Sequence, residues 1–200
     1  MKKTLLTLVV VAFGVSSFAQ GTLNILNTLG TSFRAQVYGP QVADPGASLH
    51  GQSPAGVPPG STAYTGPLLA GTGFSFAVYA GPSGTPEGSL ALLITVPFRT
   101  GGAAGLISPL PDFIVPGVPT GQAATLQVRA WDNSTGGTFA LATVRGASEL
   151  FQSGLLGGGI NFSPDMVGWT SFNIAAVPEP STFVLAGLGA AALLIFRRRK

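Results

Sequence analysis

Apolar and polar residues alternate along several short stretches of the chain, and residues 124–131 do so most regularly. One set of alternate positions holds the apolar residues Leu126, Val128 and Ala130. The other set holds Gln127, Arg129 and Trp131. A period of two residues places these sets on opposite faces of a β-strand, so we expect the strand to be half-buried.

Similar stretches bounded by glycine and proline predict further strands at Thr22–Asn27, Ser32–Tyr38, Gly73–Ala80, Leu90–Phe98, Phe113–Val118, Phe139–Ala142 and Thr170–Ile174. The mostly apolar Leu90–Phe98 stretch is typical of a strand buried on both faces. Pro116 should place its own strand at a sheet edge, because proline cannot donate a ladder hydrogen bond. The pattern predicts an antiparallel β-sandwich of about seven or eight strands.

One long segment interrupts this pattern. Residues 43–73 are rich in glycine, proline, serine and alanine, and they predict a long, mobile loop with room for a short strand near Ala63-Tyr64. We therefore expect a single β-domain at residues 20–176, with this loop inside it.

The N-terminus has the three parts of a secretory signal peptide. Lys2 and Lys3 are followed by an apolar run of about eleven residues from Leu5 to Val15, and small residues stand at Ser17 and Ala19. This predicts a signal peptide at residues 1–19, cleaved after Ala19 by signal peptidase. An uncleaved N-terminal anchor is the alternative, but the apolar run is too short to span a bilayer.

The C-terminus has a second apolar segment with distinct flanks. Before it stand Val177, Pro178, Glu179 and Pro180, and after it stand Arg197, Arg198, Arg199 and Lys200. A transmembrane helix is predicted at about residues 181–197. Its apolar part, 183–196, rises only about 21 Å. Spanning a hydrocarbon layer of roughly 30 Å requires the arginine stems to reach the far surface. The basic cluster predicts a membrane intermediate with a cytoplasmic C-terminus.

These three features, in this order at residues 177–200, resemble the PEP-CTERM sorting signal. The resemblance implies recognition by an exosortase, with removal of the helix near Pro178-Glu179-Pro180. It also implies a Gram-negative producer of exopolysaccharide or biofilm matrix. A plain tail anchor behind a helix-breaking linker is the alternative. Three blocks of the body are similar to the extracellular β-domains that often precede such tails: Phe76–Gly84, Val96–Gly101 and Val128–Asp132.

Composition supports the β class and argues against nucleic acid as a partner. Only 8% of residues are charged, against about 25% in average soluble proteins, and Gly 29 and Pro 16 are high counts. The net charge of +3 comes from the two ends, which hold six of the ten basic residues. The body has four arginines against six acidic residues, so it lacks the basic patch that a phosphate backbone requires. The absence of cysteine excludes disulfides, thiolate metal sites and cysteine nucleophiles.

Candidate catalytic residues are few. His50 is the single histidine, and Ser48 beside it comes close to a nucleophile-elbow pattern, but in a loop. A solvated histidine is the preferred interpretation. A carboxylate pair would suit a glycosidase, and Asp132 and Glu149 are the first to test. The Asp132–Gly136 stretch has part of a calcium-loop spacing, although a hairpin turn explains it better.

Aromatic residues offer one further candidate site. A sugar-stacking surface would need exposed rings, and the available ones are Trp131, Trp169, Tyr38, Tyr64 and Tyr79. Half-buried aromatics of a sandwich are the alternative. The glycine-rich stretches 71–73 and 157–159 lack the Lys-Ser or Lys-Thr of a phosphate-binding loop.

We therefore expect a non-enzymatic protein of the cell surface or extracellular matrix, without a cofactor or metal. Its expected partners are signal peptidase, exosortase, the membrane through the C-terminal helix, and exopolysaccharide. A carbohydrate-binding module and a glycan-active enzyme are the alternatives.

Overall fold

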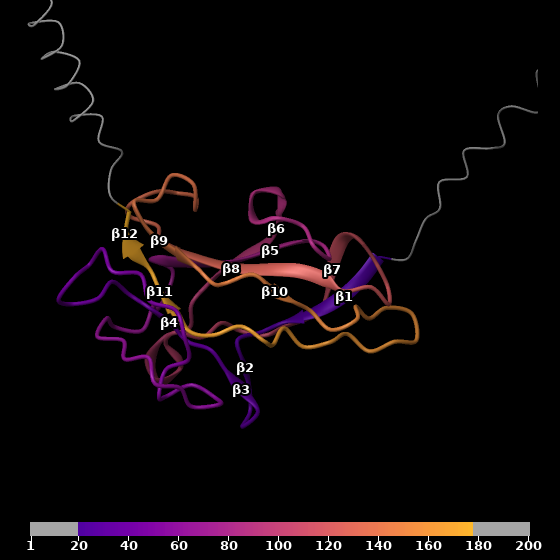
Figure 1. The fold of residues 1–200 in the computed structure, drawn as a ribbon, viewed down its shortest axis with the longest axis horizontal. Helices are drawn as coiled ribbons and strands as arrows, with labels where there is room; N and C mark the ends of the chain where they lie inside the picture. The colour runs from indigo at the N-terminus through magenta and orange to yellow at the C-terminus, as the bar shows by residue number, and fades with distance from the viewer. Residues whose placement is uncertain (1–19, 178–200) are drawn as a thin grey trace, which may run out of the picture.

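The computed structural model describes residues 20–177, and these residues are mostly β. The segments predicted as signal peptide and membrane helix lie outside the described residues. Twelve strands and two short 3-10 helices, Glu87–Ser89 and Gly101–Ala103, make up the regular structure of residues 20–177 (Figure 1). Within residues 20–177, no helix combines the length and the apolar character that a membrane crossing needs.

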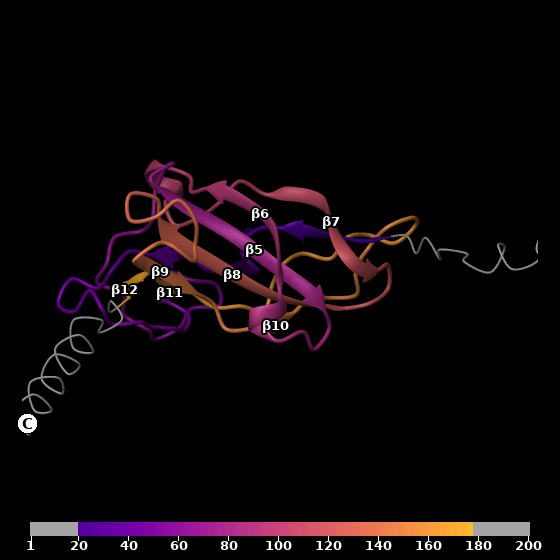
Figure 2. The ribbon, with the colours of Figure 1, turned by 90° about the horizontal axis from the view of Figure 1, so that it is seen from above.

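The main sheet has six strands built around one long antiparallel pair. β5, Phe74–Pro82, pairs along its whole length with β8, Ala124–Asp132, and Val78 lies opposite Val128. The strand order is β12-β9-β8-β5-β6, and β10 also pairs with β8 (Figure 2). The remaining strands are β6 Ala91–Pro97, β9 Val144–Ala147, β10 Phe151–Gln152 and β12 Ala175–Ala176.

Three two-stranded sheets complete the fold. β1, Gln20–Ile25, pairs antiparallel with β7, Leu110–Pro119. The other two pairs are short: β2 Thr28–Leu29 with β3 Phe33–Arg34, and β4 Val37–Tyr38 with β11 Phe172–Asn173. The β4–β11 pair is parallel, whereas the other strand pairs of the described residues are antiparallel.

One hydrophobic core joins the main sheet to the β1–β7 pair. β5 contributes Phe76, β8 contributes Leu126 and β1 contributes Leu23, each of them fully buried. The whole core is drawn from residues 23–174. Within residues 20–177, the main sheet and the β1–β7 pair therefore share one hydrophobic core.

The alternation predicted for β8 is confirmed. Leu126, Val128 and Ala130 face the core, whereas Trp131 belongs to a small second cluster on the opposite face with Ala77 and Ala142. The expectation of half burial is wrong, because Gln127 and Trp131 are only 3% and 4% exposed. The segment around Phe139 covers this face, and the Phe139 ring meets the Trp131 ring edge-on with 6.3 Å between their centroids.

Several predicted strands differ in the structure. Leu90–Phe98 does form β6, but as an edge strand that is largely exposed instead of buried on both faces. Phe139–Ala142 is a turn, in which the backbone N–H groups of Leu141 and Ala142 donate to the Thr138 carbonyl. Ser32–Tyr38 divides into β3 and β4, and such divisions raise the strand count above the expected seven or eight.

The 43–73 segment is a loop, as predicted, but side-chain hydrogen bonds fasten it to the body. The Tyr64 hydroxyl lies 2.7 Å from the carbonyl oxygens of both Gly51 and Ser171. The short strand expected near Ala63-Tyr64 is absent from the described loop. At Gly66 the loop passes against Gly39, the residue after β4, and a Cβ atom at Gly66 would collide with the Gly39 carbonyl.

Candidate functional site

The segment predicted as a sorting signal follows directly after an edge strand of the main sheet. The edge strand β12 pairs with β9, and the next residue, Val177, donates its backbone N–H to the Thr143 carbonyl at 2.8 Å. Ala176 donates likewise to the Pro45 carbonyl at 2.8 Å. Hydrogen-bonded structure therefore continues up to the first residue of the Val177-Pro178-Glu179-Pro180 motif.

The other predicted processing residues fall outside the described residues. These are Ala19, Pro178, Glu179, Pro180 and the basic cluster Arg197, Arg198, Arg199 and Lys200. Both described ends, Gln20 and Val177, lie at the surface at opposite ends of the long axis (Figure 1).

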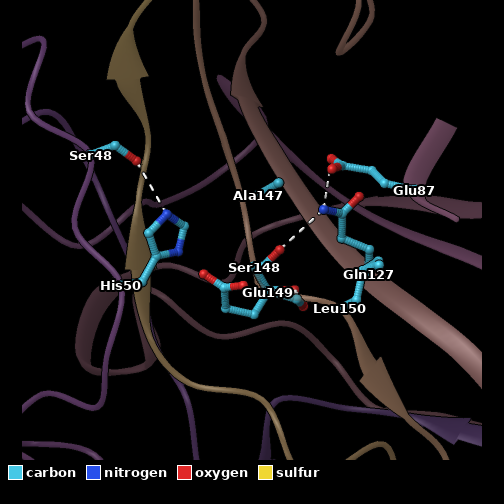
Figure 3. A pocket seen from close by; sticks show the side chains of 8 residues that line it. All are labelled: Ser48, His50, Glu87, Gln127, Ala147, Ser148, Glu149 and Leu150. Atoms are coloured by element: carbon cyan, nitrogen blue, oxygen red, sulfur yellow. Dashed lines mark hydrogen bonds between the residues drawn. The ribbon is translucent and has the colours of Figure 1, made fainter.

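A polar depression of about 470 Å³ opens near the junction of β8 and β9. The residues that line it are Ser48, His50, Glu87, Gln127, Ala147, Ser148, Glu149 and Leu150 (Figure 3). They come from the 43–73 loop, the first 3-10 helix, β8, the end of β9, and the segment between β9 and β10. Tertiary structure thus joins the Ser48–His50 candidate with Glu149, one of the two candidate acids.

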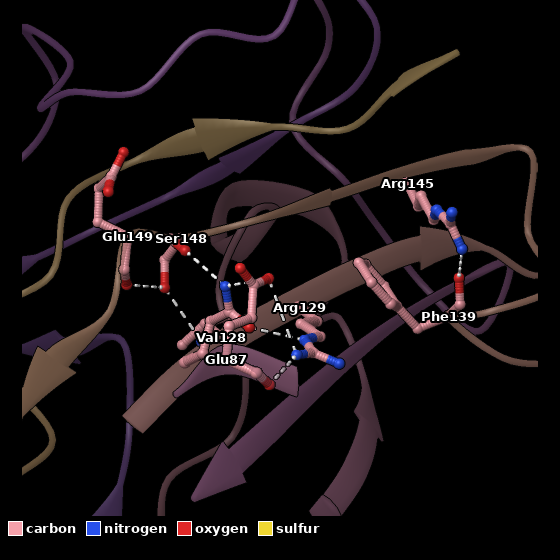
Figure 4. Close-up of polar contacts among 8 residues, drawn as sticks. Glu87, Val128, Arg129, Phe139, Arg145, Ser148 and Glu149 are labelled. Atoms are coloured by element: carbon pink, nitrogen blue, oxygen red, sulfur yellow. Dashed lines mark hydrogen bonds and ion pairs between the residues drawn. The ribbon is translucent and has the colours of Figure 1, made fainter. Parts of the chain in front are cut away.

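The floor of this depression is a charged hydrogen-bond network (Figure 4). The buried Gln127 amide donates to the Glu87 carboxylate at 2.9 Å and to the Ser148 carbonyl at 3.1 Å. Its oxygen accepts a hydrogen bond of 2.7 Å from Arg129 Nε. Arg129 also donates to the Glu87 carbonyl at 3.2 Å, and its guanidinium lies 4.0 Å from the centre of the Tyr79 ring. The network holds Glu87 and Arg129 in place and satisfies the buried amide.

Ser48 and His50 stand at the rim. The Ser48 hydroxyl and His50 Nε2 are 3.3 Å apart, and both residues are exposed. Two carboxylates, those of Glu87 and Glu149, are also exposed at the same depression. The arrangement presents hydrogen-bond acceptors and negative charge to solvent, which suits a hydroxyl-rich or cationic ligand. Within residues 20–177, no group of three or more acidic or histidine side chains is placed to hold a metal ion.

The predicted Asp132–Glu149 pair does not line this depression together. Asp132 ends β8 and its carboxylate accepts hydrogen bonds from the backbone and hydroxyl of Ser134 at 2.8 and 2.7 Å. The Thr135 N–H donates to the Asp132 carbonyl at 3.1 Å. The preferred interpretation of residues 132–136 as a turn is therefore confirmed.

The aromatic residues lie mainly inside the body. Trp131 and Trp169 are each 4% exposed, so neither indole ring lies open on the surface as a flat stacking platform for a sugar. Tyr38 and Tyr64 stack on each other at 4.2 Å between ring centres, and Tyr79 lies under Arg129. Burial raises the pKa of Tyr64 above its ordinary value, and the neighbouring Tyr38 adds to this shift.

Sequence reasoning missed the roles of Glu87, Gln127 and Arg129. The alternation of β8 placed Gln127 and Arg129 on one face, which was the only available signal. Glu87 lies forty residues earlier and reaches the network because β5 pairs with β8, which brings the 3-10 helix after β5 to this face.

A compact β-domain that leads at once into a Pro-Glu-Pro motif, an apolar run and a basic end defines an exported protein with a C-terminal sorting signal. Residues 176–200 match the PEP-CTERM protein-sorting motif, so this tail is the sorting signal of an exosortase substrate. The motif implies export, exosortase processing, and a surface or extracellular location. No curated protein and no solved structure matches the chain.

Proposed function

We propose that this protein is a structural component of the cell surface or of an exopolysaccharide-containing extracellular matrix, and that it is not an enzyme. We interpret the six-stranded main sheet and the β1–β7 pair, which share one core, as the two layers of a β-sandwich. In this proposal the protein is exported, held by the C-terminal helix, and then freed from that helix by exosortase. The observation that carries the proposal is the sorting motif, which begins where β12 ends.

A structural role is supported by the use of polar side chains inside the body. The Gln52 amide donates to the Arg34 carbonyl at 2.6 Å and accepts from Ser171 N at 3.1 Å. Asn173 donates to the Ala47 carbonyl at 2.9 Å and accepts from Leu49 N at 2.7 Å. These amides fasten the long loop to β11 and β3. Their hydrogen bonds are made within the body, as expected of side chains that stabilise the fold, whereas a catalytic amide would face a substrate.

The mass of the mature protein, recovered from its own host, tests the processing step. We expect a chain that begins at Gln20 and ends near Pro178-Glu179-Pro180. A Glu179→Ala variant should keep the helix and stay in the membrane fraction, whereas Glu149→Ala, which changes an acid of the body, should be processed normally. A mature wild-type chain that still carried residues 183–200 would refute processing and indicate a permanent anchor.

The shared position of Glu87 and Glu149 favours a second candidate function, the binding or cleavage of a glycan at the polar depression. Exopolysaccharide from the host is the first ligand to test. Binding that is lost in Glu149→Gln, with reducing ends released over time, would support a glycan-active enzyme. Binding without release of reducing ends would support a carbohydrate-binding module, and no binding would leave the structural role.

A further inference from the structure

Two large apolar side chains stand almost free of the body at the tip of one loop. Ile160 and Phe162 are 98% and 97% exposed. Leu155, close by in the sequence, is 68% exposed. Large exposed apolar patches are uncommon on soluble domains, and where they occur they commonly mark interaction sites.

The loop that carries these side chains is fixed in place. Gly158 and Asn161 exchange backbone hydrogen bonds of 2.9 and 3.1 Å, which close a tight turn. Gly157 exchanges a further pair, of 2.9 and 3.0 Å, with Thr22 of β1. A Cβ atom at Gly157 would lie 2.5 Å from Ser163 N, so glycine is required there. The tip, residues 159–162, is therefore held outward at the end of the molecule near Gln20 (Figures 1 and 2).

The same chain has an apolar pocket of about 270 Å³ elsewhere on its surface. Its lining residues are Phe33, Gln52, Val57, Pro58, Gly168, Trp169 and Thr170. Phe33 belongs to the β2–β3 hairpin, which Figure 1 shows away from the orange loop at the right-hand end. A cavity of about 150 Å³ accommodates a benzene ring, so this pocket has room for a phenylalanine side chain.

We propose that the tip of one copy, with Phe162 leading and Ile160 beside it, docks into the Phe33–Trp169 pocket of a second copy. Tip and pocket occupy different places on the molecule, so the contact is heterologous. Repetition of a heterologous contact builds open chains of subunits unless the rotation happens to close a ring. This inference rests on the proposed structural role and gives it a mechanism of assembly.

Charge favours a second copy over a lipid surface as the occupant. The charged residues tied to the tip are acidic: Asp112 accepts a hydrogen bond of 2.5 Å from Ser163, and Asp165 accepts one of 2.9 Å from Asn24. Anionic membranes instead attract lysine and arginine. The charge beside the pocket is Arg34, whose backbone pairs with Val57 and whose Nε has no hydrogen-bond partner within the described residues.

The contact is small, which sets the conditions for observing it. Stable interfaces bury about 1,200–2,000 Å² in total, more than one loop tip and one pocket supply. We therefore expect association at high protein concentration, such as that of a matrix or of a crowded membrane surface. A series of oligomers should grow with concentration and show no preference for the dimer.

Analytical ultracentrifugation of the body, residues 20–177, tests this with two complementary variants. The tip variant carries Ile160→Asn and Phe162→Asn, and the pocket variant carries Thr170→Glu, which places a carboxylate at the pocket mouth. Each alone should associate about tenfold to a hundredfold more weakly than the parent protein, because the burial of one or two apolar side chains is lost. Val42→Asn is the control, since Val42 is also an exposed apolar residue, at 75%, and should have no effect.

Mixing the two variants gives the decisive result. The pocket variant still offers a tip and the tip variant still offers a pocket, so the mixture should form dimers and nothing larger. A pocket variant that associates as well as the parent would overturn the proposal, as would parent protein that stays monomeric at millimolar concentration. Parent protein that instead sediments with phosphatidylcholine vesicles through its tip would also overturn it and would indicate a lipid surface. None of these outcomes alters the mass of the mature chain, which tests processing separately.

Discussion

Asn27 is expected to be among the most sensitive polar positions of the body. Its side chain is fully buried and makes three hydrogen bonds: to the carbonyl oxygens of Ala35 and Gly105 at 3.0 and 2.9 Å, and from the Ile107 N–H at 3.0 Å. Asn27→Ala leaves the Ala35 carbonyl and the Ile107 N–H without these partners, while Gly105 still accepts from Val37 at 3.3 Å. At about 1–3 kcal/mol for each unsatisfied buried group, the loss is about 4 kcal/mol of unfolding free energy.

Asn24 supplies the matched control. It also makes three side-chain hydrogen bonds, with Ser163, Asp165 and Asp112, but it is only partly buried. Water can replace its side chain, so Asn24→Ala should cost about 1 kcal/mol. Urea unfolding of residues 20–177, followed by the fluorescence of the buried tryptophans, measures both values by linear extrapolation. Equal losses, or a loss below about 1.5 kcal/mol for Asn27→Ala, would refute the assignment of this cost to buried unsatisfied groups.

The remaining predictions concern pH, an ion pair and a close backbone approach. Burial raises the pKa of Tyr64 in the folded state above its unfolded value of about 10. The contribution of Tyr64 to the free energy of unfolding is therefore complete below about pH 10 and is lost as the pH rises further, because the unfolded chain loses this proton more readily than the folded one. Tyr64→Phe should therefore flatten the alkaline limb of the stability curve, and an unchanged limb would contradict this. Glu87→Gln removes the 3.8 Å ion pair between the exposed Glu87 carboxylate and Arg129. The free energy of unfolding, measured by thermal denaturation, should therefore change by less than about 0.5 kcal/mol at any salt concentration. Gly66→Ala should cost about 2 kcal/mol or more in urea unfolding because its Cβ meets backbone, whereas Gly73→Ala, which meets nothing within 4 Å, should be nearly neutral.

Local alternation predicted the strands whose two faces differ in chemistry. β8 alternates so regularly that both faces could be assigned, and β5 follows the same rule. The prediction failed for Leu90–Phe98, since an apolar strand at a sheet edge has the same sequence pattern as a central one. It failed again at Phe139–Ala142, whose apolar side chains cover a sheet face without forming a strand.

The candidate site shows the same division. Ser48, His50 and Glu149 could be selected from the sequence as chemically able residues, but their meeting in one depression depends on a long loop folding over β11. The network of Glu87, Gln127 and Arg129 depends on strand pairing between segments forty residues apart, and no local pattern records such pairing.

The sequence by itself determined the sorting tail, the β class and the alternation of the central strand, because each depends on residues that are neighbours in the chain. A sorting signal is read as a linear order of motif, apolar run and basic end, and a strand face is set by every second residue. Only the tertiary structure decided that Trp131 is covered, that the 43–73 loop is fastened, and that Ile160 and Phe162 are left exposed. Burial is a property of what packs against a side chain, and those partners come from distant parts of the chain.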